Sequence, residues 1–111
     1  MTIYKILSTQ QWSEAVETGS FNGSSIDIAD GFIHFSTASQ VQETARKHFA
    51  GVSDLLLVAV PADALAHAIK WEPSRGGELF PHLYGPLPVT LATWVKPMLV
   101  DADGNPIVPG L

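Results

Sequence analysis

One uninterrupted apolar run near the middle of the chain does most to limit its fold. Residues 55–60 read Leu-Leu-Leu-Val-Ala-Val, and Pro61 follows them. Even with Pro61 included, the run is far too short to span a bilayer. A strand that is buried on both of its faces has a continuous apolar sequence of this kind. We therefore expect residues 55–60 to form the central strand of a sheet.

Further strands are expected on both sides of this run. Residues 2–7 are apolar and β-branched enough for a first strand. Three shorter segments also predict strands, at residues 32–35, 68–72 and 89–95, with residues 98–100 as an extension of the last one. The sequence Asp-Ala-Asp-Gly-Asn at residues 101–105 is typical of a hairpin turn, so residues 98–111 are expected to form a C-terminal hairpin or tail.

Two main helices are expected between these strands. Ser8 and Gln11 have the spacing of a capping box, and Gly19 is a natural C-terminal stop. Thr37 and Gln40 repeat the capping-box spacing ahead of a helix predicted over residues 38–50. Short helical turns are expected at residues 25–29 and 61–65. Strands and helices do not alternate regularly, which favours an α+β fold with a mixed or mainly antiparallel sheet.

The cations of the chain are few and scattered. Six Lys and Arg residues stand against eleven Asp and Glu residues, which gives a net charge of −5. Nucleic-acid binding is therefore disfavoured, because phosphate backbones require clustered positive charge. A small ligand with one or two phosphates remains compatible. The 111 residues, the absence of cysteine and the lack of an apolar leader predict a single cytoplasmic domain over residues 1–111, without disulfides or a membrane segment.

The first candidate site lies in the segment Asp-Gly-Phe-Ile-His-Phe-Ser-Thr at residues 30–37. Alternation along a strand would turn Ile33 and Phe35 towards the core, and His34 and Ser36 towards the opposite face. With the N–H groups of the following helix nearby, these side chains and Thr37 predict an anion or ribose pocket. The alternative is a buried histidine bonded to a backbone carbonyl, with Ser36 or Thr37 serving only as a helix cap.

The second candidate site lies in the segment Glu-Leu-Phe-Pro-His-Leu-Tyr-Gly-Pro-Leu-Pro at residues 78–88. Phe80, His82 and Tyr84 alternate among prolines, as in a stiff loop that loses little entropy when it binds a ligand. The alternative is a rigid connection whose aromatic rings fill the edge of the core. The cis or trans state of Pro86 and Pro88 is left open by the sequence.

Other polar residues are given smaller roles. His48 is expected to be a solvated partner of a helix C-terminus, and His67 a surface residue. The four histidines lack the spacing of a metal site, so none is predicted. Glu72 is interpreted as exposed in preference to a strand-end carboxylate that faces the site. Arg75 lies in a glycine-rich loop from which it could close over a phosphate.

Several of these segments resemble a known family. The matching parts are Ile-Tyr-Lys-Ile at residues 3–6, Trp12, Gly-Phe-Ile-His-Phe-Ser at residues 31–36, Gln40-Val41 and Phe-Pro-His-Leu-Tyr-Gly-Pro-Leu at residues 80–87. They resemble the bacterial family called domain of unknown function 952, from Ile3 to about Pro97. The resemblance implies an ADP-ribosyltransferase-like fold, in which a split, curved sheet grips NAD.

The same resemblance suggests roles for particular residues. By comparison with RNA 2′-phosphotransferases, His34 matches a motif histidine that would touch the ADP-ribose or nicotinamide part of a ligand. Lys5 stands where those enzymes have a first-strand histidine; a lysine there could contact phosphate but could not act as an imidazole would. Glu72 and Glu78 are the candidates for the glutamate of toxin-type ADP-ribosyltransferases, without a motif to choose between them.

Together these features predict a protein that binds a nucleotide-type ligand, NAD or ADP-ribose, as a substrate or ligand. His34 and His82 are the candidate catalytic acid–base groups. The candidate ligand-binding residues are Lys5, Ser36, Thr37, Arg75, Phe80 and Tyr84. A non-catalytic module that senses a metabolite or binds a protein is the main alternative, and a hydrolase that uses His34 and His82 without a dinucleotide is a weaker one. The oligomeric state is not predicted.

Overall fold

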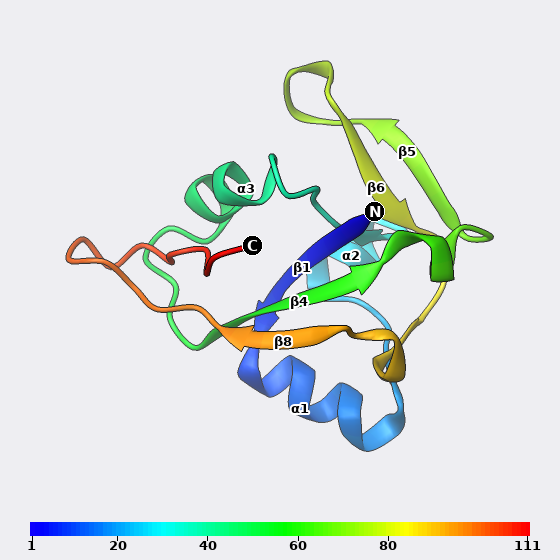
Figure 1. Ribbon diagram of the computed structural model, residues 1–111, viewed down its shortest axis with the longest axis horizontal. Coiled ribbons are helices and arrows are strands. Elements are labelled where there is room, and N and C mark those ends of the chain that lie inside the picture. The colour runs from blue at the N-terminus through cyan, green and yellow to red at the C-terminus, as the bar shows by residue number, and fades with distance from the viewer.

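The apolar run does form the centre of a sheet in the computed structural model, which describes residues 1–111 apart from the side chain of Arg75. Strand β4 (Leu55–Pro61) lies between β1 (Thr2–Ser8) and β8 (Trp94–Pro97), and both pairings are antiparallel. Figure 1 shows these three strands side by side. The continuous apolar sequence of β4 is explained by its position, because both of its faces are covered.

A second antiparallel sheet has the order β3-β6-β5, formed by Ile33–His34, Leu79–Leu83 and Ile69–Pro73. It is joined to the first sheet at one place, where Tyr4 and Ser36 form an isolated antiparallel bridge. The N–H of Tyr4 donates to the carbonyl of Ser36 at 2.8 Å, and the N–H of Ser36 donates to the carbonyl of Tyr4 at 2.9 Å. The sheets therefore meet along β1 and β3 and separate beyond this bridge.

Helices α1 (Thr9–Thr18) and α3 (Val41–His48) cover opposite faces of the first sheet (Figure 1). Ala15 of α1 packs in one core cluster, and Ala45 of α3 packs in a second one. Consecutive residues of β1 enter different clusters, Ile3 the first and Tyr4 the second. This is the alternation expected of a strand that has a core on each side.

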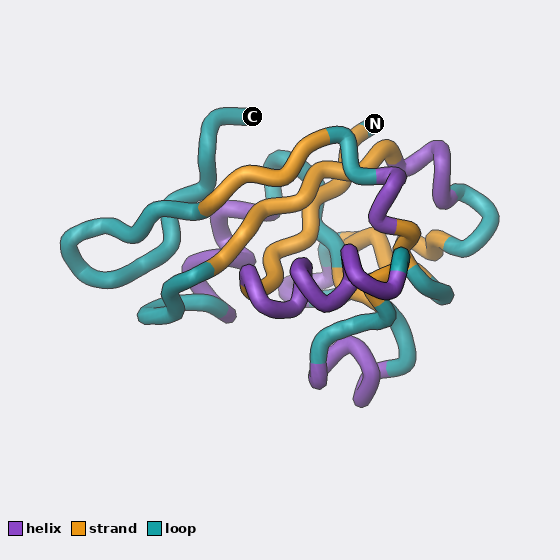
Figure 2. Tube along the Cα trace, turned by 90° about the horizontal axis from the view of Figure 1, so that it is seen from below, coloured by secondary structure: helices purple, strands orange, loops and turns teal.

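The remaining elements are short. They are α2 (Ser25–Asp30), the strand pair β2 (Ser20–Phe21) and β7 (Leu87–Pro88), and the 3₁₀ turns at Ala62–Leu65, Arg75–Gly77 and Val89–Leu91. After β8 the chain forms a loop that projects from the end of the first sheet (Figure 2). Its turn is closed by hydrogen bonds between Asp101 and Asn105, and Val100 and Pro106 form a bridge, as a hairpin turn requires.

The α+β fold, the first helix with its Ser8–Gln11 capping box, and the short helix after Ser24 were predicted correctly. The expected helix at residues 38–50 is too long, because α3 runs only from Val41 to His48. The side chain of Gln40 accepts a hydrogen bond from the N–H of Thr37, and residues 38–40 form a turn. The expected strand at residues 89–95 is also shifted, since β8 begins only at Trp94 and is preceded by a 3₁₀ turn.

The interpretation of residues 80–84 as a stiff loop is wrong. They lie in or next to β6, which pairs with a strand on each side. Pro81 cannot donate to the sheet, but its carbonyl accepts a hydrogen bond from the N–H of Phe35 at 3.0 Å. The peptide bonds before Pro86 and Pro88 are trans, since the described backbone contains no cis bond. In the described residues no helix is both long and apolar enough to cross a membrane.

Candidate functional site

A cavity of about 610 Å³ lies where the two sheets separate. Its walls come from β1, α2, β3, α3 and β6, so both sheets contribute to it. Four phenylalanine and tyrosine side chains, Tyr4, Phe35, Phe49 and Phe80, line it together with polar groups. Cavities of this size with apolar walls and a few convergent polar groups are typical of small-molecule sites.

His34 and His82 both line this cavity, as the sequence predicted. They are directly opposite each other in the pairing of β3 with β6. The centroids of their rings are 5.5 Å apart, and the rings meet edge to face. Two imidazoles that are 48 positions apart in sequence are thus neighbours because of strand pairing.

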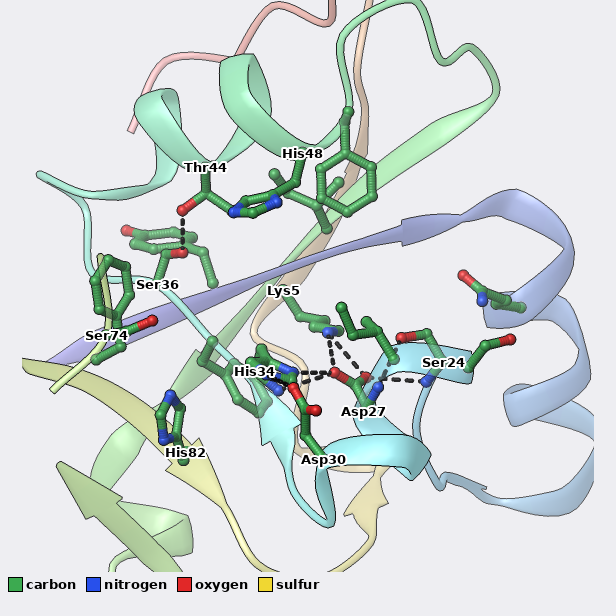
Figure 3. Close-up of a pocket in the computed structure, with 18 residues that line it drawn as sticks. Lys5, Ser24, Asp27, Asp30, His34, Ser36, Thr44, His48, Ser74 and His82 are labelled. Atoms are coloured by element: carbon green, nitrogen blue, oxygen red, sulfur yellow. Dashed lines mark hydrogen bonds and ion pairs between the residues drawn. The ribbon is translucent and has the colours of Figure 1, made fainter. Parts of the chain in front are cut away.

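Both ring nitrogens of His34 face carboxylates. Nδ1 lies 2.6 Å from Oδ1 of Asp27, and Nε2 lies 2.9 Å from Oδ2 of Asp30 (Figure 3). An ionised carboxylate can only accept hydrogen bonds, so both contacts are satisfied when each ring nitrogen carries a hydrogen. In this arrangement neither ring nitrogen of His34 is free to contact a ligand without giving up a carboxylate partner.

Asp27 is the buried centre of the polar network. It is only 2% exposed and lies in the first turn of α2, where its side chain completes the capping box by accepting from the N–H of Ser24 at 2.9 Å. It also accepts from the N–H of His34 at 3.1 Å. Burial opposes ionisation, but the His34 hydrogen bond, the Lys5 charge and the Ser24 N–H outweigh it and hold the pKa of Asp27 well below its ordinary value.

Lys5 reaches this network from β1. The residue is 6% exposed, and its Nζ lies 2.9 Å from Oδ2 and 3.1 Å from Oδ1 of Asp27. Burial lowers the pKa of Lys5, and the attraction of Asp27 offsets this lowering only in part. Lys5 lines the cavity, but the phosphate contact predicted for it would have to share an ammonium that already pairs with Asp27.

His82 is held by a different carboxylate. Its Nδ1 lies 2.8 Å from Oε1 of Glu72, and the hydroxyl of Tyr84 donates to the same oxygen at 2.7 Å. These hydrogen bonds, from Tyr84 first and His82 second, lower the pKa of Glu72, and the bond to Glu72 raises the pKa of Tyr84. The preferred interpretation of Glu72 as merely exposed is therefore corrected, because it is a strand-end carboxylate bonded to a cavity residue.

The other predicted residues divide into two groups. Ser36 and Phe80 line the cavity, and the Ser36 hydroxyl is 2.9 Å from that of Thr44. Thr37 and Tyr84 are not among the described residues that line it. The side chain of Arg75 lies outside the described part of the structure. Glu78 is placed 3.3 Å from the amide nitrogen of Gln40.

Sequence reasoning missed several cavity residues. Asp27 and Asp30 were not chosen, although Asp27 stands three residues after Ser24 in the spacing of a capping box. Thr44 and His48 also line the cavity, from consecutive turns of α3 (Figure 3). His48 was assigned only to a solvated helix end, because the helical pattern does not reveal what lies across from it. His67 is exposed, as predicted. Within the described residues, no group of three or more His, Asp or Glu side chains is arranged to hold a metal ion.

Comparison with known proteins identifies the family. A family model described as "Protein of unknown function (DUF952)" matches residues 6–95. The chain belongs to the DUF952 family. It is similar to protein CC0527 of Caulobacter crescentus: the X-ray structure of that protein is 51% identical, with 96% of this chain and 94% of that chain covered and a TM-score of 0.94. The solution NMR structure of CC0527 is 52% identical, with coverages of 95% and 90% and a TM-score of 0.85. No curated protein matches the chain.

Proposed function

We propose that this DUF952 protein binds a nucleotide-type ligand, NAD or ADP-ribose, and acts on it as an ADP-ribosyl- or phosphotransferase-like enzyme. The observation that carries the proposal is the meeting of His34 and His82 on one cavity. Imidazole changes charge between about pH 5 and 8, so it suits proton transfer at cellular pH. Two imidazoles at one site can serve an attacking group and a leaving group.

The shape of the sheet supports the choice of ligand class. The order β5-β6-β3 continues through the Tyr4–Ser36 bridge into β1-β4-β8. This is a split sheet with a cavity at the split, which is the arrangement implied by the resemblance to ADP-ribosyltransferase-like folds. The aromatic walls of the cavity suit a flat heterocycle, and the Lys5 ammonium that also lines it suits phosphate oxygens.

Binding and turnover can be tested together. We expect NAD or ADP-ribose to raise the thermal unfolding temperature, and NAD to be cleaved with release of nicotinamide. His34→Ala and His82→Ala should abolish the release, whereas His67→Ala, at an exposed histidine outside the cavity, should leave it unchanged. If neither nucleotide stabilises the wild-type chain, the proposal is wrong.

The second candidate is a non-catalytic module that binds a metabolite. It is favoured by the contacts of Lys5 and His34, whose side-chain nitrogens already bind the carboxylates of Asp27 and Asp30. A site built in this way can hold a ligand without offering a free base from β3. Stabilisation by a nucleotide with no detectable nicotinamide release would select this alternative.

A further inference from the structure

The two histidines of the cavity are held in different ways, and the difference assigns them different roles. We infer that Glu72 is a positioning residue that fixes His82 with the lone pair of Nε2 facing the cavity, so that the proton acceptor is His82 and not His34, whose two ring nitrogens are both bonded to carboxylates. The catalytic part of this inference rests on the proposed function. The tautomer of His82 does not, and it can be measured without a ligand.

The contacts of His82 define its tautomer. Nδ1 faces Oε1 of Glu72 at 2.8 Å. Because an ionised carboxylate only accepts, Nδ1 must carry the hydrogen, and in a neutral imidazole Nε2 then carries a lone pair. Nε2 makes no hydrogen bond to any described residue, and the ring lines the cavity (Figure 3). The ring of Phe32 stacks on His82 with centroids 4.1 Å apart and planes at 24°, which restricts rotation of the imidazole.

The register of the second sheet explains why Glu72 can reach His82. Lys70 is directly opposite His82, and Glu72 is opposite Phe80. Glu72 is therefore a diagonal neighbour of His82 on the same face of the sheet. Tyr84, two residues beyond His82, donates to the same carboxylate oxygen at 2.7 Å. The Nζ of Lys70 lies 4.6 Å from the centroid of the Tyr84 ring, so the cluster also contains a cation.

These donors favour the ionised form of Glu72. The hydrogen bonds from Tyr84 and His82 and the charge of Lys70 lower its pKa, against a smaller opposing effect of burial. A carboxylate beside Nδ1 holds the ring in one tautomer and stabilises the imidazolium that forms when Nε2 takes a proton, as in other His–carboxylate pairs. Glu72 acts only through His82, because it is not among the described residues that line the cavity.

His34 cannot perform the same step. Both of its nitrogens already face carboxylate oxygens, at 2.6 Å and 2.9 Å. In the step assigned to His82, an O–H bond of a hydroxyl or water in the cavity breaks and an Nε2–H bond forms, and the electron pair of the O–H bond stays on the attacking oxygen. The positive charge gained by the ring lies next to Glu72, and the same proton can later return to a leaving group.

The tautomer is tested by NMR on the ligand-free protein labelled with ¹⁵N at histidine, in mildly alkaline buffer. Long-range ¹H–¹⁵N spectra distinguish the Nδ1–H from the Nε2–H form, and His82→Gln assigns the signals. We expect Nδ1–H at His82 in the wild type and in Tyr84→Phe. Glu72→Ala should shift His82 towards the Nε2–H form, with the exposed His67 as the internal reference for an imidazole that has no carboxylate partner among the described residues. Glu17→Ala, which removes an exposed carboxylate from α1, should change nothing. An Nε2–H form in the wild type, or no shift in folded Glu72→Ala, overturns the inference.

Measurements of NAD turnover test this inference separately from the proposed function. If NAD is cleaved, Glu72→Ala should lower kcat about tenfold or more while changing the KM for NAD much less. Glu17→Ala should leave both constants unchanged. An unchanged kcat in a Glu72→Ala variant that has lost the Nδ1–H tautomer would refute the role assigned to Glu72. The expected tautomer in a protein that binds no nucleotide would refute the proposed function alone and leave the positioning of His82 established.

Discussion

Replacing Asp27 by alanine should destabilise the fold by about 3–5 kcal/mol, the usual cost of leaving one partner of a buried ion pair alone. The structure gives the reason. The side chain of Asp27 is 1% exposed, and that of its partner Lys5 is 8% exposed. Without the carboxylate, the Lys5 ammonium would be buried with no counter-charge among the described residues. The N–H groups of Ser24 and His34 would also lose their acceptor.

The reverse substitution should cost less. In Lys5→Met, Asp27 keeps the donors of Ser24 and His34, at 2.9, 3.1 and 2.6 Å. Only the charge-assisted pairing of Asp27 with the Lys5 ammonium is removed, and a hydrogen bond of this kind is worth about 1.5–3 kcal/mol. The methionine retains most of the apolar packing of the lysine stem. In the double variant the unpaired ammonium is absent. Its cost should therefore fall short of the sum of the single variants by about 1–3 kcal/mol.

Urea unfolding of the four proteins measures these free energies directly. For a domain of this size the loss expected in Asp27→Ala corresponds to a fall in Tm on the order of 10 °C or more. Asp63→Ala, which removes an exposed aspartate from a 3₁₀ turn, is the matched control and should change little. The reasoning fails if Asp27→Ala costs no more than Lys5→Met, or if the two single effects simply add.

Three further outcomes follow from the same contacts and from the core. The pKa of Asp27 is lower in the fold than its ordinary value of 3.8, so its contacts stabilise above that pH and are lost as the pH falls through the lower folded value. Acid unfolding should accordingly be steeper in the wild type than in Asp27→Asn. The pKa of Tyr84 is raised above 10.0 by Glu72, so Glu72→Ala should lower the pKa of Tyr84 towards the ordinary value in an ultraviolet titration, with Tyr84→Phe assigning the signal. Leu57 is fully buried, so Leu57→Ala should cost about 2–5 kcal/mol in urea unfolding, whereas Leu99→Ala, at a leucine that is 72% exposed, should cost less than about 0.5 kcal/mol.

The parts of the fold that local sequence determines could be predicted. The continuous apolar sequence of β4 requires a strand that is covered on both faces, and Ser8 with Gln11 specifies the start of α1 through bonds within four residues. The start of α3 was placed too early: Gln40 does accept from the N–H of Thr37 as in a capping box, but residues 38–40 form a turn and the helix begins at Val41. β6 was missed because Pro81 argues against a central strand. Its carbonyl still pairs with Phe35, and only tertiary structure shows this.

The site could be predicted only in part, for a related reason. His34 and His82 were found because each imidazole breaks an apolar or proline-rich segment that has no structural need of it. Their partners depend on contacts between distant parts of the chain. Lys5 meets Asp27 across 22 positions, and Glu72 meets His82 through the register of β5 and β6. The capping box alone explains a carboxylate such as Asp27 in the sequence, and its second role is visible only when the strand beside it is placed.

The two carboxylates should respond differently to removal, because only one of them links separate parts of the fold. Asp27, on α2, joins Lys5 of the first sheet to His34 of the second sheet, so the pairing crosses the split that forms the cavity. Loss of the Asp27 carboxylate would remove these contacts between the two sheets at the cavity. It should therefore lower both the stability of the fold and the affinity for a ligand. Among the described residues, Glu72 hydrogen-bonds to His82 of its own sheet and to Tyr84 just beyond β6, at a side chain that is 36% exposed. Its loss should alter the tautomer of His82 while leaving the urea midpoint almost unchanged. A large fall in that midpoint for Glu72→Ala would mean that the Glu72–His82 pair also helps to hold the sheet together, and the contrast drawn here between the two carboxylates would then be wrong.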